Sequence, residues 1–479
     1  MVERQVDVAI IGVGTAGMGA YRAAREHTDS LALIEGDQYG TTCARVGCMP
    51  SKLLIAAAEA ARGIERAPGF GVHVDGQLRI EGKEVMLRVR EERDRFVGFV
   101  IESVEEWDPA HRIMAQASFV DDHTLELSNG DTLRADRIVI ATGSKPFCPP
   151  LFQPAGDRLI TTDDVFYWED LPNSVVVFGA GAIGVEIGQA LARLGVRVRL
   201  FGRGGSIGRL SDPEVKASAI AALQDEMAFD PDPDVSGVER EGDEITIRFS
   251  ENGEEREERF DYLLAATGRR ANLEGLALEN TGLQLNDIGA PLFNRYTMQC
   301  GDSHIFIAGD VDGDVALLHE AADQARIAGN NAGHYPTIRI GLRRSPIGII
   351  FTEPNIATVG KSYSELNESG CDFHIGQVDF AGQGRSRVML ENKGLLRVYA
   401  EHGSALFLGA EMVGPRTEHM AHLLSWAHQK RMTVAEMLEM PFYHPVIEEG
   451  LRTALRDLNT QLNVAPSMVK RSMDCGPGA

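Results

Sequence analysis

The chain has 479 residues, of which 43% are apolar and 24% charged, the composition of an ordinary soluble globular protein. Its length predicts roughly two to four domains. The net charge of −23 argues against nucleic acid as a partner, because binding to phosphates needs an excess of Lys and Arg. We also expect no membrane partner and a cytoplasmic location, since no apolar run approaches the roughly 20 residues of a membrane span, no signal peptide is evident and cysteines are few.

The first predicted element is an apolar strand that runs into a glycine-rich turn. Residues 8–11 are followed by Gly12, Gly14 and Gly17 in a Gly-x-Gly-x-x-Gly pattern. Such glycines let a pyrophosphate approach the N-terminus of the next helix. Glu35 ends the following strand, at the usual distance for a carboxylate that binds a ribose hydroxyl. A glycine turn without a ligand is the alternative.

Two cysteines come next. Cys43 and Cys48 enclose Ala-Arg-Val-Gly and are followed at once by Met-Pro-Ser and Lys52. A close dithiol can form a disulfide, and beside a bound flavin it can accept two electrons and pass them on by thiol exchange. Half a zinc site and unpaired core cysteines are the alternatives. No second pair at zinc spacing is present, so we expect no metal.

A second module repeats this order of elements. A strand at 175–178 leads into the second fingerprint, Gly179, Gly181 and Gly184. Each copy then carries an Asn-Gly hairpin, at 129–130 and 252–253, for which we predict type I′ turns. Each copy closes with a strand that ends in Ala-Thr-Gly, which brings in Thr142 and Gly143 in the first copy and Gly268 in the second. Two such copies predict two dinucleotide-binding domains.

The last third of the chain supplies two further candidate sites. A short apolar strand at 303–308 ends in Gly-Asp, where Asp310 could bind a ribityl or phosphate-side group or could simply cap a helix. After Ser345 the pattern has strands and helices but no fingerprint, as expected of an association domain. His444 and Glu449 follow, five residues apart with Pro445 between them. Such a histidine can take the proton of an attacking thiol while the carboxylate fixes its tautomer, although a core or turn histidine is the alternative.

Together these segments resemble the class I flavin-dependent pyridine nucleotide-disulfide oxidoreductases, which include lipoamide dehydrogenase, glutathione reductase and mercuric reductase. The resemblance rests on residues 42–52, both fingerprints, both Ala-Thr-Gly strands, 307–311 and 444–449. It implies an α/β chain with two Rossmann-like domains, for FAD and NAD(P), and a C-terminal α+β dimerisation domain. We predict an FAD domain at 1–150, an NAD(P) domain at 151–275, a segment completing the FAD domain at 276–345 and an interface domain at 346–479.

The resemblance also implies roles for individual residues. Cys43 would exchange with the substrate, and Cys48 would face the flavin. Lys52 and Glu186 would pair beside the reactive nitrogen of the flavin, where a lysine stabilises the negative charge of the reduced ring; ordinary surface positions are the alternative. His444 and Glu449 would come from the partner subunit of a homodimer. Further cofactor contacts are predicted at Thr42, Thr142, Gly143, Gly268, Asp310 and His319.

The choice of nicotinamide depends on the strand at 196–201, which has no acid at the ribose position. Arg203 and Arg209 follow it instead. Family members that use NADPH place two arginines at this spacing, and guanidinium groups suit a phosphate. We therefore slightly favour NADP(H) over NAD, with two exposed arginines in a flexible loop as the alternative.

The substrate is predicted from local resemblance. His319 lies in Leu-Leu-His-Glu-Ala, similar to a lipoamide dehydrogenase segment, and Ala182 stands where glutathione reductases usually place a tyrosine. We predict an FAD-dependent dihydrolipoyl dehydrogenase that acts through a Cys43–Cys48 disulfide on a lipoyl-bearing substrate. The alternative is an NADPH-dependent reductase of another small or protein disulfide. Near the C-terminus, Cys475 is an incidental thiol or a shuttle to Cys43.

Overall fold

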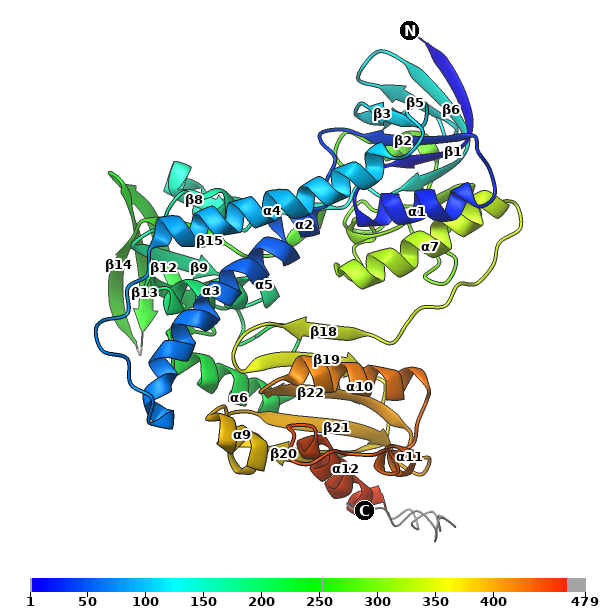
Figure 1. Ribbon diagram of the computed structural model, residues 1–479. Helices are drawn as coiled ribbons and strands as arrows, with labels where there is room; N and C mark the ends of the chain where they lie inside the picture. Colours follow the sequence, from blue (N-terminus) through cyan, green and yellow to red (C-terminus); the bar gives the residue numbers. More distant parts are fainter. Residues whose placement is uncertain (1, 252, 463–479) are drawn as a thin grey trace.

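The computed structural model describes residues 2–251 and 253–462, which form three lobes (Figure 1). The N-terminal lobe is a mainly parallel sheet in the order β3-β2-β1-β6-β5-β4, with β17 beside β6. Its strands are β1 (Glu3–Ile11), β2 (Leu31–Glu35), β3 (Arg112–Met114), β4 (Ala117–Phe119), β5 (Thr124–Leu127), β6 (Thr132–Ile140) and β17 (Ile305–Ile307). The pairing of β17 with β6 brings a segment from beyond residue 300 into the first sheet. Helices α1 (Thr15–Arg25) and α7 (Leu318–His334) pack side by side below it.

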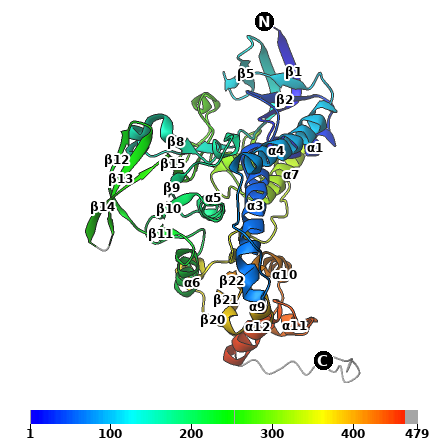
Figure 2. The ribbon, with the colours of Figure 1, turned by 60° about the vertical axis from the view of Figure 1, so that its left-hand side comes forward.

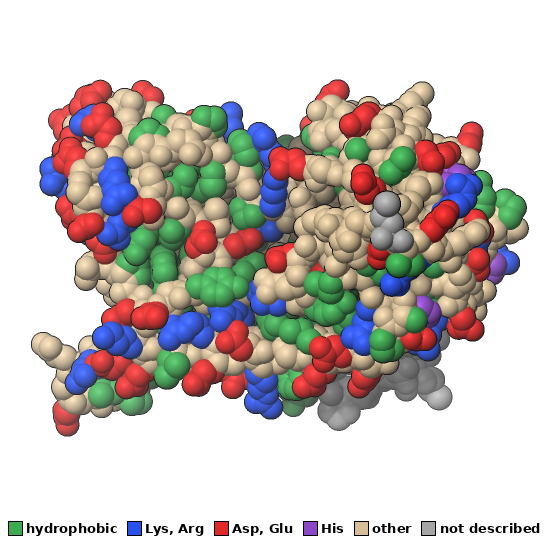
Figure 3. Space-filling view, turned by 90° about the horizontal axis from the view of Figure 1, so that it is seen from above, with side chains coloured by type: hydrophobic (Ala, Val, Ile, Leu, Met, Phe, Trp, Pro, Cys, Tyr) green, Lys and Arg blue, Asp and Glu red, His purple; other side chains and the backbone are tan. Residues whose placement is uncertain are grey.

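The middle lobe is a second parallel sheet, in the order β11-β10-β9-β15-β8. Its strands are β8 (Leu159–Thr161), β9 (Ser174–Phe178), β10 (Arg197–Phe201), β11 (Ala228–Asp230) and β15 (Tyr262–Ala265), with helices α5 (Ala182–Arg193) and α6 (Pro213–Gln224). A separate antiparallel sheet joins β12 (Asp234–Glu241), β13 (Glu244–Glu251) and β14 (Glu254–Phe260). The short strands β7 (Ser144–Pro146) and β16 (Arg269–Ala271) pair between the two lobes. Acidic and basic side chains are mixed over the upper face of the molecule (Figure 3).

The prediction of a type I′ turn at 129–130 is wrong. That turn requires a positive φ at both central residues, but only Gly130 has one, at 86°. The side-chain oxygen of Asn129 accepts the N–H of Asp131 at 3.0 Å, so Asn129 acts as an Asx turn rather than as a left-handed residue. The loop is consequently one residue longer, with Leu127 N donating to Asp131 O at 2.9 Å. In the second copy, Asn252 lies outside the described residues.

Two long helices connect the lobes (Figure 2). They are α3 (Cys48–Arg66), which follows the short helix α2 (Thr42–Val46), and α4 (Gly82–Glu105). Although they precede the middle lobe in sequence, Leu54 and Met86 share a hydrophobic core with Val177 and Val185 of that lobe. Helix α3 packs directly against α5. This packing places the residues after Cys48 beside the start of the second module.

The C-terminal lobe has an antiparallel sheet in the order β18-β19-β22-β21-β20. Its elements are β18 (Ile347–Ile350), β19 (Asn355–Gly360), α8 (Tyr363–Glu368), β20 (Phe373–Asp379), α9 (Gly384–Met389), β21 (Leu395–Glu401), β22 (Phe407–Gly414), α10 (Thr417–Gln429), α11 (Val434–Leu438) and α12 (Glu449–Leu462). Helix α10 packs on β19 and β22, and α12 packs on β20 and β21. The predicted fold class, two nucleotide-type α/β units followed by an α+β unit, is confirmed. Among the described helices, none combines the length and apolar character of a membrane span.

Candidate active site

The first fingerprint forms a tight strand-to-helix turn. A Cβ atom on Gly12 would lie 2.4 Å from the carbonyl oxygen of Ala141, and one on Gly17 would lie 1.8 Å from the carbonyl oxygen of Gly12. These two glycines therefore allow close backbone packing. By contrast, a Cβ on Gly14 would meet nothing within 4 Å, and Gly14 provides no side-chain cap for α1. The uncapped N–H groups of α1 thus face open space beside Gly14, which fits a pyrophosphate.

The second fingerprint has the same geometry. A Cβ on Gly179 would lie 2.2 Å from the carbonyl oxygen of Ala266, and one on Gly184 would lie 1.9 Å from that of Gly179. Gly181 again faces open space and leaves α5 without a side-chain cap. The residues of both modules fit one dinucleotide each.

The other predicted contacts of the first module lie around the carboxyl ends of its strands. Glu35 is half-buried at the end of β2, where its Oε2 accepts the N–H of Val13 in the fingerprint turn at 2.9 Å. Thr142 follows β6, and its hydroxyl donates to the carbonyl oxygen of Asn272 at 2.7 Å. Gly143 has a positive φ and faces open space, as does Gly268 after β15 of the second module, and Thr42 is exposed at the start of α2. The structure thus gathers most of these residues at the edge of the sheet where α/β proteins bind ligands.

Unpartnered polar atoms gather after β17. Asp310 Oδ2 accepts the hydroxyl of Ser144 at 2.7 Å. The buried atoms Asp312 Oδ2, His319 Nε2 and Gln324 Nε2 have no hydrogen-bond partner among the described residues. Burial raises the pKa of Asp312 to about 6. Because an unpaired buried polar group costs roughly 1–3 kcal/mol, this segment fits a polar ligand such as the cofactor expected here.

Asp312 and Gln324 were not predicted from the sequence. Asp312 is 3% exposed and Gln324 is 0% exposed, and Gln324 Oε1 accepts the N–H of Gly309 at 2.6 Å. The buried face of α7 also contains Glu320, Asp323 and Asn331, so no signal in the sequence singles out Gln324.

The two cysteines lie at a helix junction. Cys43 is in α2 and Cys48 begins α3, and a Cβ on the intervening Gly47 would lie 2.9 Å from the carbonyl oxygen of Thr42. Both are free thiols in the structure and are close enough to hydrogen bond. The hydrogen bond from Cys43 and the charge of Lys52 lower the pKa of Cys48 to about 7. The same hydrogen bond, together with burial, raises the pKa of Cys43.

Lys52 and Glu186 form an ion pair across α3 and α5. The Nζ–Oε2 distance is 2.6 Å, and the side chain of Glu186 is only 6% exposed. Lys52 lies one helical turn after Cys48, so its ammonium is on the same side of α3 as the thiol. A nearby cation favours a thiolate, and the charge of Lys52 lowers the pKa of Cys48 in addition to the larger effect of the hydrogen bond from Cys43.

His444 and Glu449 also form a pair, in the C-terminal lobe. His444 Nδ1 lies 2.9 Å from Oε1 and 3.1 Å from Oε2 of Glu449, and the N–H of Val446 donates to Oε2 at 3.2 Å. The hydrogen bond with His444 lowers the pKa of Glu449. The imidazole is 80% exposed, and α12, which begins at Glu449, lies far from α2 in the same chain (Figure 1). One chain therefore does not bring this pair to Cys43.

The arginine pair after β10 is exposed. Neither Arg203 nor Arg209 takes part in an ion pair with another described residue. An acid lies close to the same loop, because Asp232 Oδ1 accepts the N–H of Gly204 at 2.6 Å. The segment after β10 thus carries two exposed arginines, and its main chain is bound by the exposed Asp232.

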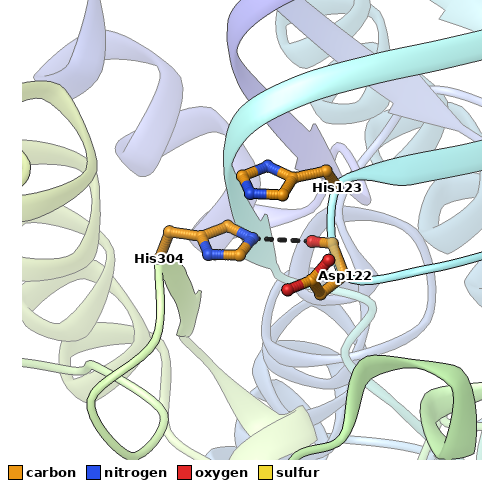
Figure 4. A group of neighbouring side chains, drawn as sticks. All are labelled: Asp122, His123 and His304. Carbon is orange, nitrogen blue, oxygen red and sulfur yellow. Dashed lines mark hydrogen bonds between the residues drawn. The ribbon is translucent and has the colours of Figure 1, made fainter.

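One cluster of potential metal ligands lies outside this site (Figure 4). It consists of Asp122, His123 and His304, but each imidazole already bonds a main-chain oxygen: His123 Nδ1 that of Ala135 at 2.8 Å, and His304 Nε2 that of Asp122 at 2.7 Å. The two rings are stacked at 3.8 Å with an interplanar angle of 3°. Lone pairs in parallel planes do not converge on one ion, so we assign no metal to this cluster.

The chain matches the model of the pyridine nucleotide-disulphide oxidoreductases over residues 6–325 and that of their dimerisation domain over residues 347–455. It is 28% identical to a mercuric reductase of Staphylococcus aureus, covering 94% of this chain and 81% of the relative. It is 27% identical to a dihydrolipoyl dehydrogenase of Chlamydia muridarum, covering 96% and 98%. Similar folds include LpdA of Mycobacterium tuberculosis, with a TM-score of 0.80 at 22% identity, and the HOCl-induced flavoprotein disulfide reductase RclA of Escherichia coli, with 0.79 at 21%; each match covers 95% of this chain and 99% of the other.

Proposed function

Because the chain belongs to the pyridine nucleotide-disulphide oxidoreductase family, we propose that it is an FAD-dependent dihydrolipoyl dehydrogenase. The family uses FAD and NAD(P)H, and the match to its dimerisation domain supports a homodimer. The observation that carries the proposal is the hydrogen-bonded pair of His444 and Glu449. A histidine held in this way suits thiol substrates, which must lose a proton in order to attack.

The proposed chemistry starts from the oxidised cysteine pair. A substrate thiolate attacks Cys43 Sγ, a mixed disulfide forms, and Cys48 leaves as a thiolate. The second thiolate of the substrate then attacks the substrate sulfur that is bonded to Cys43. This attack forms the product disulfide and releases Cys43 as a thiolate. A low pKa makes Cys48 a good leaving group, and its value of about 7 supports this direction of attack.

In this scheme His444 of the partner subunit takes the protons of the two attacking thiols in turn at Nε2. One of them passes to the Cys43 thiolate that the second attack releases, and the other stays on the imidazole, while Cys48 remains a thiolate. Glu449 holds Nδ1, so that Nε2 carries the lone pair in the neutral ring. Lys52 stabilises negative charge near Cys48, with Glu186 keeping its ammonium in place. Bound FAD would supply the two-electron relay between the dithiol and the nicotinamide.

Initial rates with different substrates test this proposal. We expect the oxidation of dihydrolipoamide by NAD⁺ or NADP⁺ to have the highest kcat/KM. The reactions for comparison are the reductions of oxidised glutathione, of a thioredoxin disulfide and of Hg²⁺, each with NADPH as the reductant. His444→Gln should lower the dihydrolipoamide rate by about 10²-fold, the low end of the usual effect of losing a general base. An enzyme that reduces another disulfide with NADPH but does not oxidise dihydrolipoamide would contradict the proposal.

The second candidate is that NADPH-dependent disulfide reductase. The exposed Arg203 and Arg209, neither of them paired with another described residue, favour it because a 2′-phosphate would find two available guanidinium groups. Dihydrolipoamide separates the two candidates, since only the dehydrogenase should oxidise it at a high rate; a comparison of KM for NADH and NADPH gives the nucleotide preference of the enzyme in either case.

A further inference from the structure

A loop from the C-terminal lobe reaches the ion pair of Lys52 and Glu186. Phe351, the first residue after β18, donates its main-chain N–H to Glu186 Oε1 at 2.8 Å. The centre of its ring lies 4.6 Å from Lys52 Nζ. The pair is therefore held from three directions: by α3, by α5 and by this loop.

The loop itself is fixed to α5 by its next acidic residue. Gln189 exchanges two hydrogen bonds with the main chain of Glu353, each of 2.8 Å. The carboxylate of Glu353 also pairs with Arg193 of α5 at 2.8 Å and with Arg66 of α3. These contacts fix the main chain two residues after Phe351, and the hydrogen bond to Glu186 fixes it at Phe351 itself, which remains 36% exposed.

The aromatic ring opposes loss of the ammonium to solvent. A lysine has a long flexible stem, and Lys52 is still 33% exposed although it is paired. A cation–π contact of this kind contributes about 0.5–2 kcal/mol, depending on how far the cation is desolvated. The ring thus adds a second restraint to that of the carboxylate.

We propose that Phe351 is a positioning residue of the redox centre, whose ring holds the ammonium of Lys52 where it stabilises the Cys48 thiolate. This inference rests on the proposed redox role of Cys48 but not on the identity of the substrate. It also gives the C-terminal lobe a function within its own chain, in addition to the dimerisation expected of it.

The groups that face Cys48 determine in which direction its pKa should change when the ring of Phe351 is removed. Cys43 on α2 donates a hydrogen bond, Lys52 on α3 lowers the pKa of Cys48, and Glu186 on α5 raises it. If the ammonium moves toward solvent, the carboxylate of Glu186 stays behind. The pKa of Cys48 then rises, and less thiolate is present near neutral pH.

The fraction of Cys48 present as thiolate can be measured by alkylating the reduced holoenzyme with iodoacetamide between pH 5 and 9 and following Cys48 by mass spectrometry. We expect Phe351→Leu to lower the alkylation rate of Cys48 by about two- to five-fold at pH values well below its native pKa of about 7, the loss that a cation–π contact at the weaker end of its range would produce. Phe351→Tyr keeps a ring over the ammonium and should behave as the native protein. Phe99→Leu, which removes the exposed cation–π contact with Arg95 on α4, is the matched control and should change nothing at Cys48.

A double-mutant comparison separates positioning from a general packing role. In a Lys52→Met background, Phe351→Leu should have no further effect on the alkylation rate, because the ring then has no cation to hold. An unchanged rate in Phe351→Leu alone, or the same fall in both backgrounds, would overturn the proposal. Neither result would decide which substrate the enzyme uses, because the rates with dihydrolipoamide test that separately.

Discussion

The two halves of the candidate site are built in opposite ways. The half that contains Cys43, Cys48 and Lys52 lies where three lobes of one chain meet, and its ion pair is 2.6 Å long with a carboxylate only 6% exposed. The half that contains His444 and Glu449 is a local pair near the start of α12, with an imidazole that is 80% exposed. The first half is complete within one chain, whereas the second has no target in its own chain. In the proposed mechanism, electron transfer to the cysteines is therefore a property of each subunit, whereas proton transfer from the substrate thiol to His444 requires the dimer.

The largest expected effect comes from breaking the first half. Cys48→Ser removes the leaving thiolate, so we expect turnover with any disulfide or dithiol substrate to fall by about 10³-fold or more. Steady-state rates with dihydrolipoamide measure this loss. Cys371→Ser, which changes an isolated half-buried thiol, is the control and should retain the native rate.

Mixing two inactive variants tests the second half. Dimers that combine a Cys48→Ser chain with a His444→Gln chain contain one site with both an intact cysteine pair and an intact histidine, provided that the histidine comes from the partner. After subunit exchange in equal amounts, we expect recovery of about a quarter of the native activity, since half of the dimers are mixed and each has one intact site. Recovery no greater than the sum of the two parents would show that the two halves act within one chain.

The effect of the Lys52 charge on the pKa of Cys48 can be tested by varying the pH. The Cys48 thiolate predominates above its pKa of about 7 and is lost as the pH falls below it. Lys52→Met removes a charge that lowers this pKa, so the titration should move to higher pH. A rise of about one pKa unit would leave roughly ten-fold less thiolate well below the midpoint. Alkylation profiles of the two proteins give the shift, and a shift to lower pH would contradict the proposed role of Lys52.

The smallest effect is expected at the predicted site for the nicotinamide nucleotide, which belongs to neither half of the candidate site. Replacing Arg203 and Arg209 together by Ala should raise KM for NADPH by about three- to ten-fold and leave KM for NADH nearly unchanged, because only the former has a 2′-phosphate to bind. Equal changes for the two nucleotides would indicate that the arginines are ordinary surface residues. Arg256→Ala on β14 is a suitable control, as an exposed arginine on a separate sheet.

Local sequence patterns were sufficient for the parts of the molecule that are local in the chain. Both glycine turns, the cysteine pair and the pair of His444 with Glu449 each lie within a few residues, and their spacing indicates their chemistry. The hairpin at 129–130 was mispredicted even so, because the Asn129 side chain bonds the backbone two residues on, and that choice is not visible in the Asn-Gly pattern.

Contacts between distant residues were not predictable from such patterns. Lys52 and Glu186 are separated by 134 positions, and their pairing was expected only from the family resemblance. Phe351 is 165 positions from Glu186 and was not identified at all. The burial of α3 and α4 against the middle lobe likewise depends on tertiary packing, which the amphipathic pattern of a helix does not specify.

An anaerobic titration of the native flavoprotein with dihydrolipoamide tests the central claim most directly, namely that the Cys43–Cys48 pair accepts electrons from a dithiol. Cys48→Ser is the comparison. We predict that dihydrolipoamide produces a long-wavelength charge-transfer absorbance in the native protein, which arises from the Cys48 thiolate beside the flavin, and that Cys48→Ser lacks it. A native protein that develops this absorbance with NADPH but never with dihydrolipoamide would contradict the dihydrolipoyl dehydrogenase assignment and favour the disulfide reductase.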